Sequence, residues 1–201
     1  AQVEPSSSLR PYHMTVEEYE RIANSGALGD RSRVFLWKGQ LVEKVSDRTK
    51  NRPHITAVNE LDSLLSEFLR RAGGFFVEQD QPIRLGDDSV PEPDLKIVRG
   101  RNRDYAARTP TVADCPLVIE VADSSVRDDR TEMLQGYAEG GVATYWIVNI
   151  PSRCIEVYTG PSGPGYPAGY ARCQSFGPDD EVPVVLDGTE VGRVAVRDVL
   201  P

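Results

Sequence analysis

One apolar run stands out in this chain of 201 residues: Pro116-Leu-Val-Ile-Glu-Val-Ala122, with a single acid, Glu120, near its centre. A short and nearly continuous apolar run is typical of a strand that is buried on both faces of a sheet. Side chains alternate along a strand, so Val118, Glu120 and Ala122 share one face. Burying the Glu120 carboxylate is costly unless a basic partner, protonation or a metal ion compensates for the lost hydration.

A second acid opens the preceding strand along the chain. Pro91-Glu-Pro93 stiffens the approach to Asp94-Leu-Lys-Ile-Val98, whose apolar residues predict a strand. If these consecutive strands pair, the carboxylates of Asp94 and Glu120 converge at one edge of the sheet. Two close anions raise the pKa of one carboxyl or recruit a divalent cation. A site made of oxygen ligands favours Mg²⁺ or Mn²⁺ over zinc.

Residue types alone leave a second interpretation of both acids open. Arg127 and Arg130 follow Glu120 closely, and Arg99 follows Asp94. Each acid could therefore be a structural residue that an arginine neutralises. The choice between a metal site and two ion pairs stays open at this point.

The rest of the chain predicts helices and strands around these two. Thr15-Val-Glu-Glu18 has the spacing of a capping box and opens a short helix, and residues 33–44 predict a hairpin that turns at Gly39. An amphipathic helix follows Pro53-His54 and ends at Gly73-Gly74. We also expect a strand over 75–85 interrupted at Pro82, a helix over 128–139, strands over 143–148 and 154–158, a loop over 160–169 and a closing helix or strand over 194–200.

Length and composition bound the class of protein. A chain with 39% hydrophobic and 27% charged residues is typical of a folded globular protein. We expect a flexible N-terminal arm over residues 1–11 and a single domain over 12–201. No apolar run approaches the roughly 18 residues that a membrane helix needs. The three cysteines are far apart and indicate neither a zinc site nor disulfides, so we expect a cytoplasmic protein.

The charge of the chain limits how it can meet nucleic acid. A net charge of −8 opposes long-range attraction to phosphates, so contact with DNA must rest on a local basic patch. The loop before Pro110 supplies such a patch with Arg99, Arg101, Arg103 and Arg108. A charge run in a loop is more often simply solvated.

Several motifs, taken in order, resemble one known family. Pro93-Asp94 and the stretch Leu117-Val-Ile-Glu-Val-Ala-Asp-Ser-Ser125 are similar to the bacterial "putative restriction endonuclease" family of the PD-(D/E)xK nuclease superfamily. Further matches are Met14-Thr-Val-Glu-Glu-Tyr19, Asp129-Arg130 with Tyr137, and Gly141-Val-Ala-Thr-Tyr-Trp-Ile-Val148. The resemblance runs from about Tyr12 to Leu200. It implies an α/β fold with a restriction endonuclease-like core, in which helices flank a mixed β-sheet, and an added N-terminal helix and β-hairpin.

The resemblance further implies a metal-dependent endonuclease that hydrolyses DNA phosphodiester bonds. Asp94 and Glu120 would then ligate Mg²⁺ or Mn²⁺, with the main-chain carbonyl of Val121 as a further ligand. His54 matches a histidine at the start of the helix that flanks the site, where it could orient a phosphate or shuttle a proton. Its alternative role is a hydrogen bond to nearby backbone. Paired subunits commonly cut the two strands in such nucleases, so a homodimer is a further expectation.

Two positions depart from the family pattern. The family usually has a lysine four residues before the tyrosine that matches Tyr137, and this chain has Met133 there. A thioether cannot donate a hydrogen bond or hold a positive charge. Phe35 stands where relatives generally carry an acid. Both losses favour a rival interpretation, a catalytically inactive nuclease fold that acts as a nucleic-acid-binding or protein-interaction module.

Other cations could replace the lost lysine. Lys96 is two residues past Asp94 and on the same strand face, so we expect its ammonium at the site and give it a catalytic role. Lys44 and Lys50 flank the segment that leads to His54. Arg130 lies on the matching helix, but arginine stays protonated and could only neutralise charge.

Overall fold

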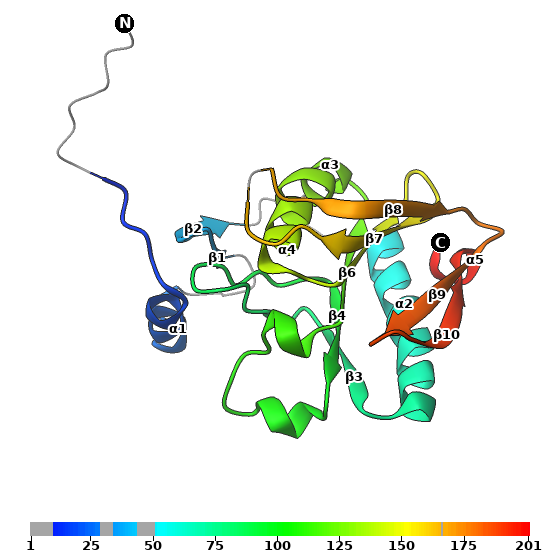
Figure 1. The fold of residues 1–201 in the computed structure, drawn as a ribbon, viewed down its shortest axis with the longest axis horizontal. Coiled ribbons are helices and arrows are strands. Elements are labelled where there is room, and N and C mark those ends of the chain that lie inside the picture. The colour runs from blue at the N-terminus through cyan, green and yellow to red at the C-terminus, as the bar shows by residue number, and fades with distance from the viewer. Residues whose placement is uncertain (1–9, 29–33, 44–50, 166) are drawn as a thin grey trace, which may run out of the picture.

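A six-stranded mixed sheet forms the centre of the molecule in the computed structural model, which describes residues 10–28, 34–43, 51–165 and 167–201. The strands lie in the order β3-β4-β5-β6-β7-β8 (Figure 1). Their bounds are β3 Phe75–Gln79, β4 Leu95–Arg99, β5 Leu117–Ala122, β6 Thr144–Asn149, β7 Cys154–Pro161 and β8 Tyr170–Phe176. β5 and β6 are parallel, and the other neighbouring pairs of this sheet are antiparallel.

Helices cover both faces of the sheet and give three layers. One face packs against α2 (Arg52–Ala72), beside which lie the hairpin β9 (Glu181–Leu186)–β10 (Thr189–Ala195) and the short helix α5 (Val196–Val199) (Figure 1). The other face packs against one continuous helical segment made of α3 (Val126–Asp128), a π-helical turn (Asp129–Met133) and α4 (Leu134–Gly140). Each face therefore has its own apolar core, and the β5 side chains alternate between the two cores.

An added N-terminal unit packs against one side of this core. It consists of α1 (Val16–Asn24) and the hairpin β1 (Val34–Trp37)–β2 (Gln40–Glu43), and has a small core that includes Val16, Leu36 and Val90. The capping box of Thr15 and Glu18 is formed, and Gly39 turns the hairpin with a φ of 74°. The ring of Trp37 lies directly over Gly136 of α4, where a Cβ atom would clash with it. This contact attaches the hairpin to the main core.

Most predicted elements are present, with several differences in extent. The strand expected over 75–85 ends at Gln79, because Asp80 takes a positive φ of 51° and Pro82 follows. The helix expected over 128–139 begins at Val126 and contains the π-helical turn. The closing segment is the end of β10 followed by α5, and the β9–β10 hairpin was not predicted. Residues 1–9 of the expected arm lie outside the described residues.

No helix in the described part of the chain combines the length and the apolar character that crossing a bilayer requires.

Candidate active site

The pairing of β4 with β5 brings Asp94 and Glu120 beside each other. The antiparallel register pairs Leu95 with Ile119 and Lys96 with Val118. Asp94 directly precedes β4, and its contacts with β5 place it beside Glu120. The side chains are 3% and 2% exposed, so both carboxylates are withdrawn from water. The expectation that two acids from consecutive strands meet at one place is confirmed by these contacts.

Main-chain groups hold the two acids together. Oδ2 of Asp94 accepts a hydrogen bond of 2.8 Å from the amide of Val121, and Oε2 of Glu120 lies 3.4 Å from the amide of Asp94. Each carboxylate therefore accepts a main-chain N–H from the strand that carries the other. Oε1 of Glu120 accepts a hydrogen bond of 2.8 Å from the hydroxyl of Tyr137.

His54 lies at the start of α2 and faces the same pair. Its Nδ1 is 2.9 Å from the carbonyl oxygen of Val121, and because a carbonyl only accepts, Nδ1 must carry the proton and donate. Nε2 then lies 3.3 Å from Oδ1 of Asp94. Nε2 is buried and makes no hydrogen bond to any described residue, since its approach to Oδ1 lacks hydrogen-bond geometry. The hydrogen bond of Asn51 to Asp123 fixes the start of α2 against the end of β5.

The residues present suit a hard divalent cation. Carboxylate oxygens from Asp94 and Glu120 are the ligands that Mg²⁺ prefers, and Mg²⁺ sites in enzymes commonly use one or two carboxylates with water and substrate phosphate. The buried Nε2 of His54 beside Oδ1 of Asp94 is a polar atom that still needs a partner. Within the described residues, no group of three or more His, Cys, Asp or Glu side chains could hold a metal ion by itself. The fit is therefore to a two-carboxylate site.

Two of the three arginines that offered a structural explanation of the two acids, Arg130 and Arg99, pair with other acids. Arg130 binds Glu156 of β7 in a bidentate ion pair. Arg99 pairs with Asp187 in the turn between β9 and β10. Both guanidinium groups are therefore paired with acids other than Asp94 and Glu120.

Lys96 is fully buried on the face of the sheet that carries Glu120, as its position two residues past Asp94 predicts. Its ammonium pairs with Oε2 of Glu78 at 2.6 Å and donates to the carbonyl of Gln81 at 2.8 Å. Burial lowers the pKa of Lys96, and the Glu78 carboxylate opposes this effect. In this structure the ammonium therefore binds a carboxylate of β3 and a carbonyl of the loop after it. A catalytic role for Lys96 stays a prediction. Lys44 and Lys50 lie outside the described residues.

The two positions that depart from the family pattern carry apolar contacts. Met133 is the last residue of the π-helical turn and packs against the core that contains Tyr137. Residues four apart on a helix share a face, so residue 133 points toward the same part of the sheet as Tyr137. Phe35 packs edge-on against Trp37, with ring centroids 6.1 Å apart.

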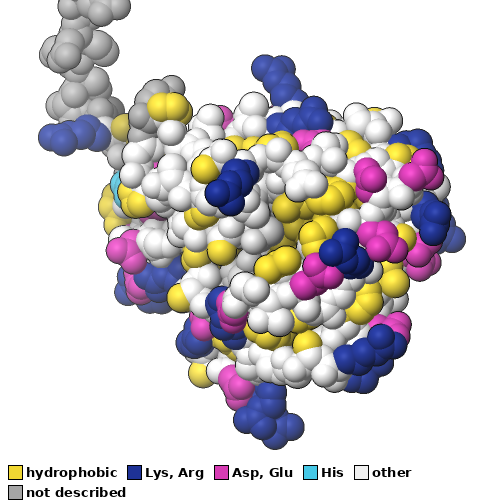
Figure 2. Space-filling view, turned by 45° about the vertical axis from the view of Figure 1, so that its right-hand side comes forward, with side chains coloured by type: hydrophobic (Ala, Val, Ile, Leu, Met, Phe, Trp, Pro, Cys, Tyr) yellow, Lys and Arg dark blue, Asp and Glu magenta, His cyan; other side chains and the backbone are white. Residues whose placement is uncertain are grey.

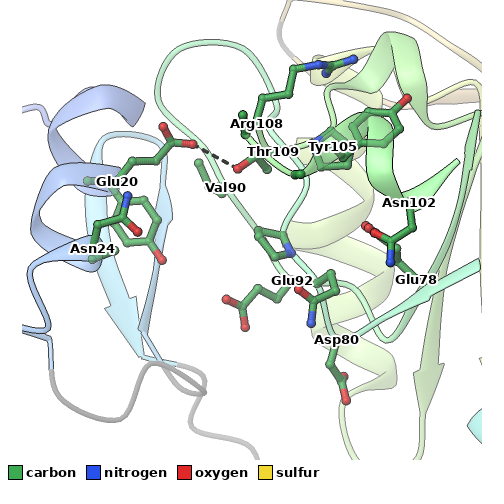
Figure 3. A pocket seen from close by; sticks show the side chains of 17 residues that line it. Glu20, Asn24, Glu78, Asp80, Val90, Glu92, Asn102, Tyr105, Arg108 and Thr109 are labelled. Atoms are coloured by element: carbon green, nitrogen blue, oxygen red, sulfur yellow. Dashed lines mark hydrogen bonds between the residues drawn. The ribbon is translucent and has the colours of Figure 1, made fainter. Parts of the chain in front are cut away.

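A cavity of about 710 Å³ lies between α1, the loop after β3 and the 3-10 turn Asn102–Tyr105. Figure 3 shows four acids in its lining, Glu20, Glu78, Asp80 and Glu92. Arg108 also lines the cavity, but its guanidinium pairs with Asp114 at 2.6 Å. An acidic cavity repels phosphate groups, so it does not suit a DNA backbone.

The loop expected to form a basic patch is largely neutralised by nearby acids. Arg99, Arg101 and Arg108 pair with Asp187, Asp104 and Asp114. On the face in Figure 2, Lys and Arg side chains are interspersed with Asp and Glu side chains. That face carries no broad surface of one charge.

A mixed sheet with helices on both faces and two buried carboxylates on adjacent strands defines a nuclease-type fold of the restriction endonuclease-like class. The chain belongs to the Uma2 family, described as "Putative restriction endonuclease", whose model matches residues 16–194. Similarity extends to a solved structure described as a "putative nuclease belonging to DUF820" from Anabaena variabilis ATCC 29413. It shares 15% identity, covers 92% of this chain and 97% of that chain, and has a TM-score of 0.67, which shows the fold. No curated protein matches this chain.

Sequence reasoning missed three contacts that shape the site. These are the amide of Val121 on Asp94, the hydroxyl of Tyr137 on Glu120 and the side chain of Asn51 on Asp123. The resemblance to the family includes Tyr137 but assigns it no role. The spacing could have indicated one, because a helix that follows a strand packs back over that strand.

Proposed function

We propose that this chain is a Mg²⁺- or Mn²⁺-dependent endonuclease that hydrolyses DNA phosphodiester bonds, with Asp94 and Glu120 as the metal ligands. The observation that carries this proposal is the buried pair of carboxylates that meet where the start of β4 lies beside β5. Burying two adjacent carboxylates is costly, and a divalent cation would offset that cost. Membership of the "Putative restriction endonuclease" family supports the same reaction class.

The residues around the pair have separate proposed roles. A bound divalent cation supplies charge neutralisation at the phosphate and lowers the pKa of water. His54, held by the carbonyl of Val121, presents Nε2 at the site, where it orients a phosphate oxygen or holds a proton. Lys96 can act on the attacking water only if its ammonium leaves Glu78. The loss of the usual lysine at Met133 makes the proposed activity weak.

A plasmid-nicking assay with Mg²⁺ or Mn²⁺ tests the proposal. We expect the wild-type protein to nick supercoiled DNA, EDTA to stop the reaction, and Glu120→Gln to abolish it. Glu67→Gln is the matched control, because Glu67 is a half-exposed acid on α2 that pairs with Arg71. Identical behaviour of the wild type and Glu120→Gln at micromolar protein would rule out this function.

A second candidate is a catalytically inactive nuclease fold that binds nucleic acid or a protein partner. Met133, Phe35 and the net charge of −8 favour it. It predicts no metal-dependent nicking and no Mg²⁺ binding that depends on Asp94. Calorimetric titration of wild-type protein and Asp94→Asn with Mg²⁺ separates the two candidates. A homodimer remains a prediction of the proposed double-strand cleavage, and analytical ultracentrifugation tests it.

A further inference from the structure

Tyr137 donates a side-chain hydrogen bond to Glu120 from complete burial. Its hydroxyl donates to Oε1 at 2.8 Å, and the side chain is 0% exposed. A tyrosine hydroxyl carries a proton and a carboxylate only accepts, so the hydroxyl is the donor in this contact. The orientation of the Glu120 carboxylate is therefore set from α4.

The hydrogen bond gives the two oxygens of Glu120 different surroundings. Oε1 is turned toward Tyr137, and Oε2 lies 3.4 Å from the amide of Asp94. A carboxylate without the Tyr137 hydroxyl could rotate about its last bond, since terminal carboxylate torsions are broad. With that hydroxyl in place, Oε2 stays on the side where Asp94 lies.

The ring of a second tyrosine, Tyr145, packs against Tyr137. The rings of Tyr137 and Tyr145 are 4.9 Å apart, and the hydroxyl of Tyr145 donates to the main-chain carbonyl of Asp129 at 3.2 Å. Asp129 begins the π-helical turn that precedes α4. A π-helical turn inserts an extra residue into a helix and so changes the direction in which later side chains point. The π-helical turn therefore aims Tyr137 at Glu120, and the Tyr145 ring, which a phenylalanine would also supply, packs beside it.

We propose that Tyr137 is a positioning residue for the divalent cation site, which it serves by turning Oε2 of Glu120 toward Asp94. This inference rests on the proposed function and adds a residue that touches neither the cation nor the DNA. Hydrogen-bond partners of metal ligands fix ligand orientation, and their loss typically lowers metal affinity by about 10- to 100-fold.

Tyr137→Phe removes the hydroxyl and keeps the ring contact with Tyr145. We expect its Mg²⁺ affinity, measured by calorimetry, to fall by about 10- to 100-fold, and a crystal structure of the variant to show a rotated Glu120 carboxylate. Tyr145→Phe is the matched control. It also loses a buried hydroxyl from the same aromatic cluster, but that hydroxyl bonds a main-chain carbonyl, so its Mg²⁺ affinity should match the wild type.

Three results would overturn the inference in distinguishable ways. If Glu120→Gln abolishes Mg²⁺ binding and Tyr137→Phe leaves it unchanged, the positioning role is wrong and the proposed function stands. Equal losses in Tyr137→Phe and Tyr145→Phe indicate general loosening of the core instead of positioning. If the wild type binds no Mg²⁺ or Mn²⁺, the proposed function and this inference fail together.

A measurement on the wild-type protein decides the matter if Tyr137→Phe does not fold. A buried hydroxyl proton that is hydrogen-bonded to a carboxylate exchanges slowly with water and gives its own NMR signal. We expect the Tyr137 hydroxyl signal to be present and to shift when Mg²⁺ is added, while the Tyr145 hydroxyl signal stays in place. A Tyr137 signal that does not respond to saturating Mg²⁺ would overturn the inference.

Discussion

Oδ2 of Asp94 accepts a 2.8 Å hydrogen bond from the main-chain amide of Val121, the residue that follows Glu120. The hydrogen bond ties the first acid to the strand that carries the second. It holds one oxygen of Asp94 and leaves Oδ1 facing His54. The site is thus built mainly from main-chain groups of β5 and from the helix start at His54.

Removing the charge of Asp94 should remove stabilisation by metal. A ligand that binds only the folded state at 100 times its Kd stabilises that state by about 2.7 kcal/mol. We expect Mg²⁺ at that concentration to raise the unfolding free energy of the wild type by about this amount and that of Asp94→Asn by none. Chemical denaturation with and without Mg²⁺ measures both values. The exposed acid Asp198 provides the control Asp198→Asn, and equal Mg²⁺ effects in all three proteins would contradict the account.

Restoring the family lysine should increase activity. Residue 133 shares a helix face with Tyr137, which contacts Glu120, so a lysine there would bring an ammonium toward the site. Because one positioned donor at a reacting centre contributes about 10²- to 10³-fold, Met133→Lys should nick plasmid DNA about 100 times faster than the wild type. Met133→Gln adds polarity without charge and should give no gain. Equal rates for the two variants would contradict this role for a cation at residue 133.

The pH dependence of stability should report on Asp114. The Arg108 guanidinium, together with the Thr111 amide and hydroxyl, holds the pKa of Asp114 well below its ordinary value of 3.8. A carboxyl with a lowered folded-state pKa contributes stability above its unfolded pKa and loses it as the pH falls through the folded one. Asp114→Asn should therefore cost about 1 kcal/mol at pH 7, mainly through the lost charge that pairs with Arg108. This cost should shrink below pH ~4. Urea denaturation at several pH values measures it, and a cost that does not change with pH would contradict the prediction.

The contact of Trp37 with Gly136 should make Gly136→Ala destabilising, although alanine normally favours a helix over glycine. Alanine in a helix interior is about 1 kcal/mol more favourable than glycine. Here an added Cβ meets the Trp37 ring, so Gly136→Ala should destabilise the protein by about 1–3 kcal/mol, as overpacking does. Replacing Trp37 by leucine in the same chain should remove most of this penalty. Additive effects of the two changes in urea denaturation would show that the contact is unimportant.

Local patterns predicted the parts of the fold that local sequence determines. Within a few residues, the sequence contains enough information to predict the capping box at Thr15, the turn at Gly39 and the buried strand β5. The pairing of Asp94 with Glu120 followed from strand order and alternation. The β9–β10 hairpin was missed because its role depends on packing against α2, which is more than a hundred residues away.

The two acids of the candidate site could be predicted from the sequence, but the residues that contact the charged groups around them could not. Alternation placed Lys96 on the correct face, yet its ammonium goes to Glu78 of β3, a choice that depends on a third strand and the loop after it. The arginine partners of Glu156 and Asp187 also come from distant segments. The contact of Tyr137 with Glu120 depends on a π-helical turn, which the sequence pattern did not predict.

The most direct test of the account is a crystal structure of the wild-type protein soaked in Mn²⁺, with anomalous scattering recorded for the metal. We predict one anomalous peak within bonding distance of Oδ1 of Asp94 and Oε2 of Glu120, with the Tyr137 hydroxyl still bonded to Oε1. The absence of an anomalous peak between these two carboxylates at millimolar Mn²⁺ would contradict the proposed metal site. A direct hydrogen bond between the Asp94 and Glu120 carboxyl groups in place of a metal ion would contradict it as well.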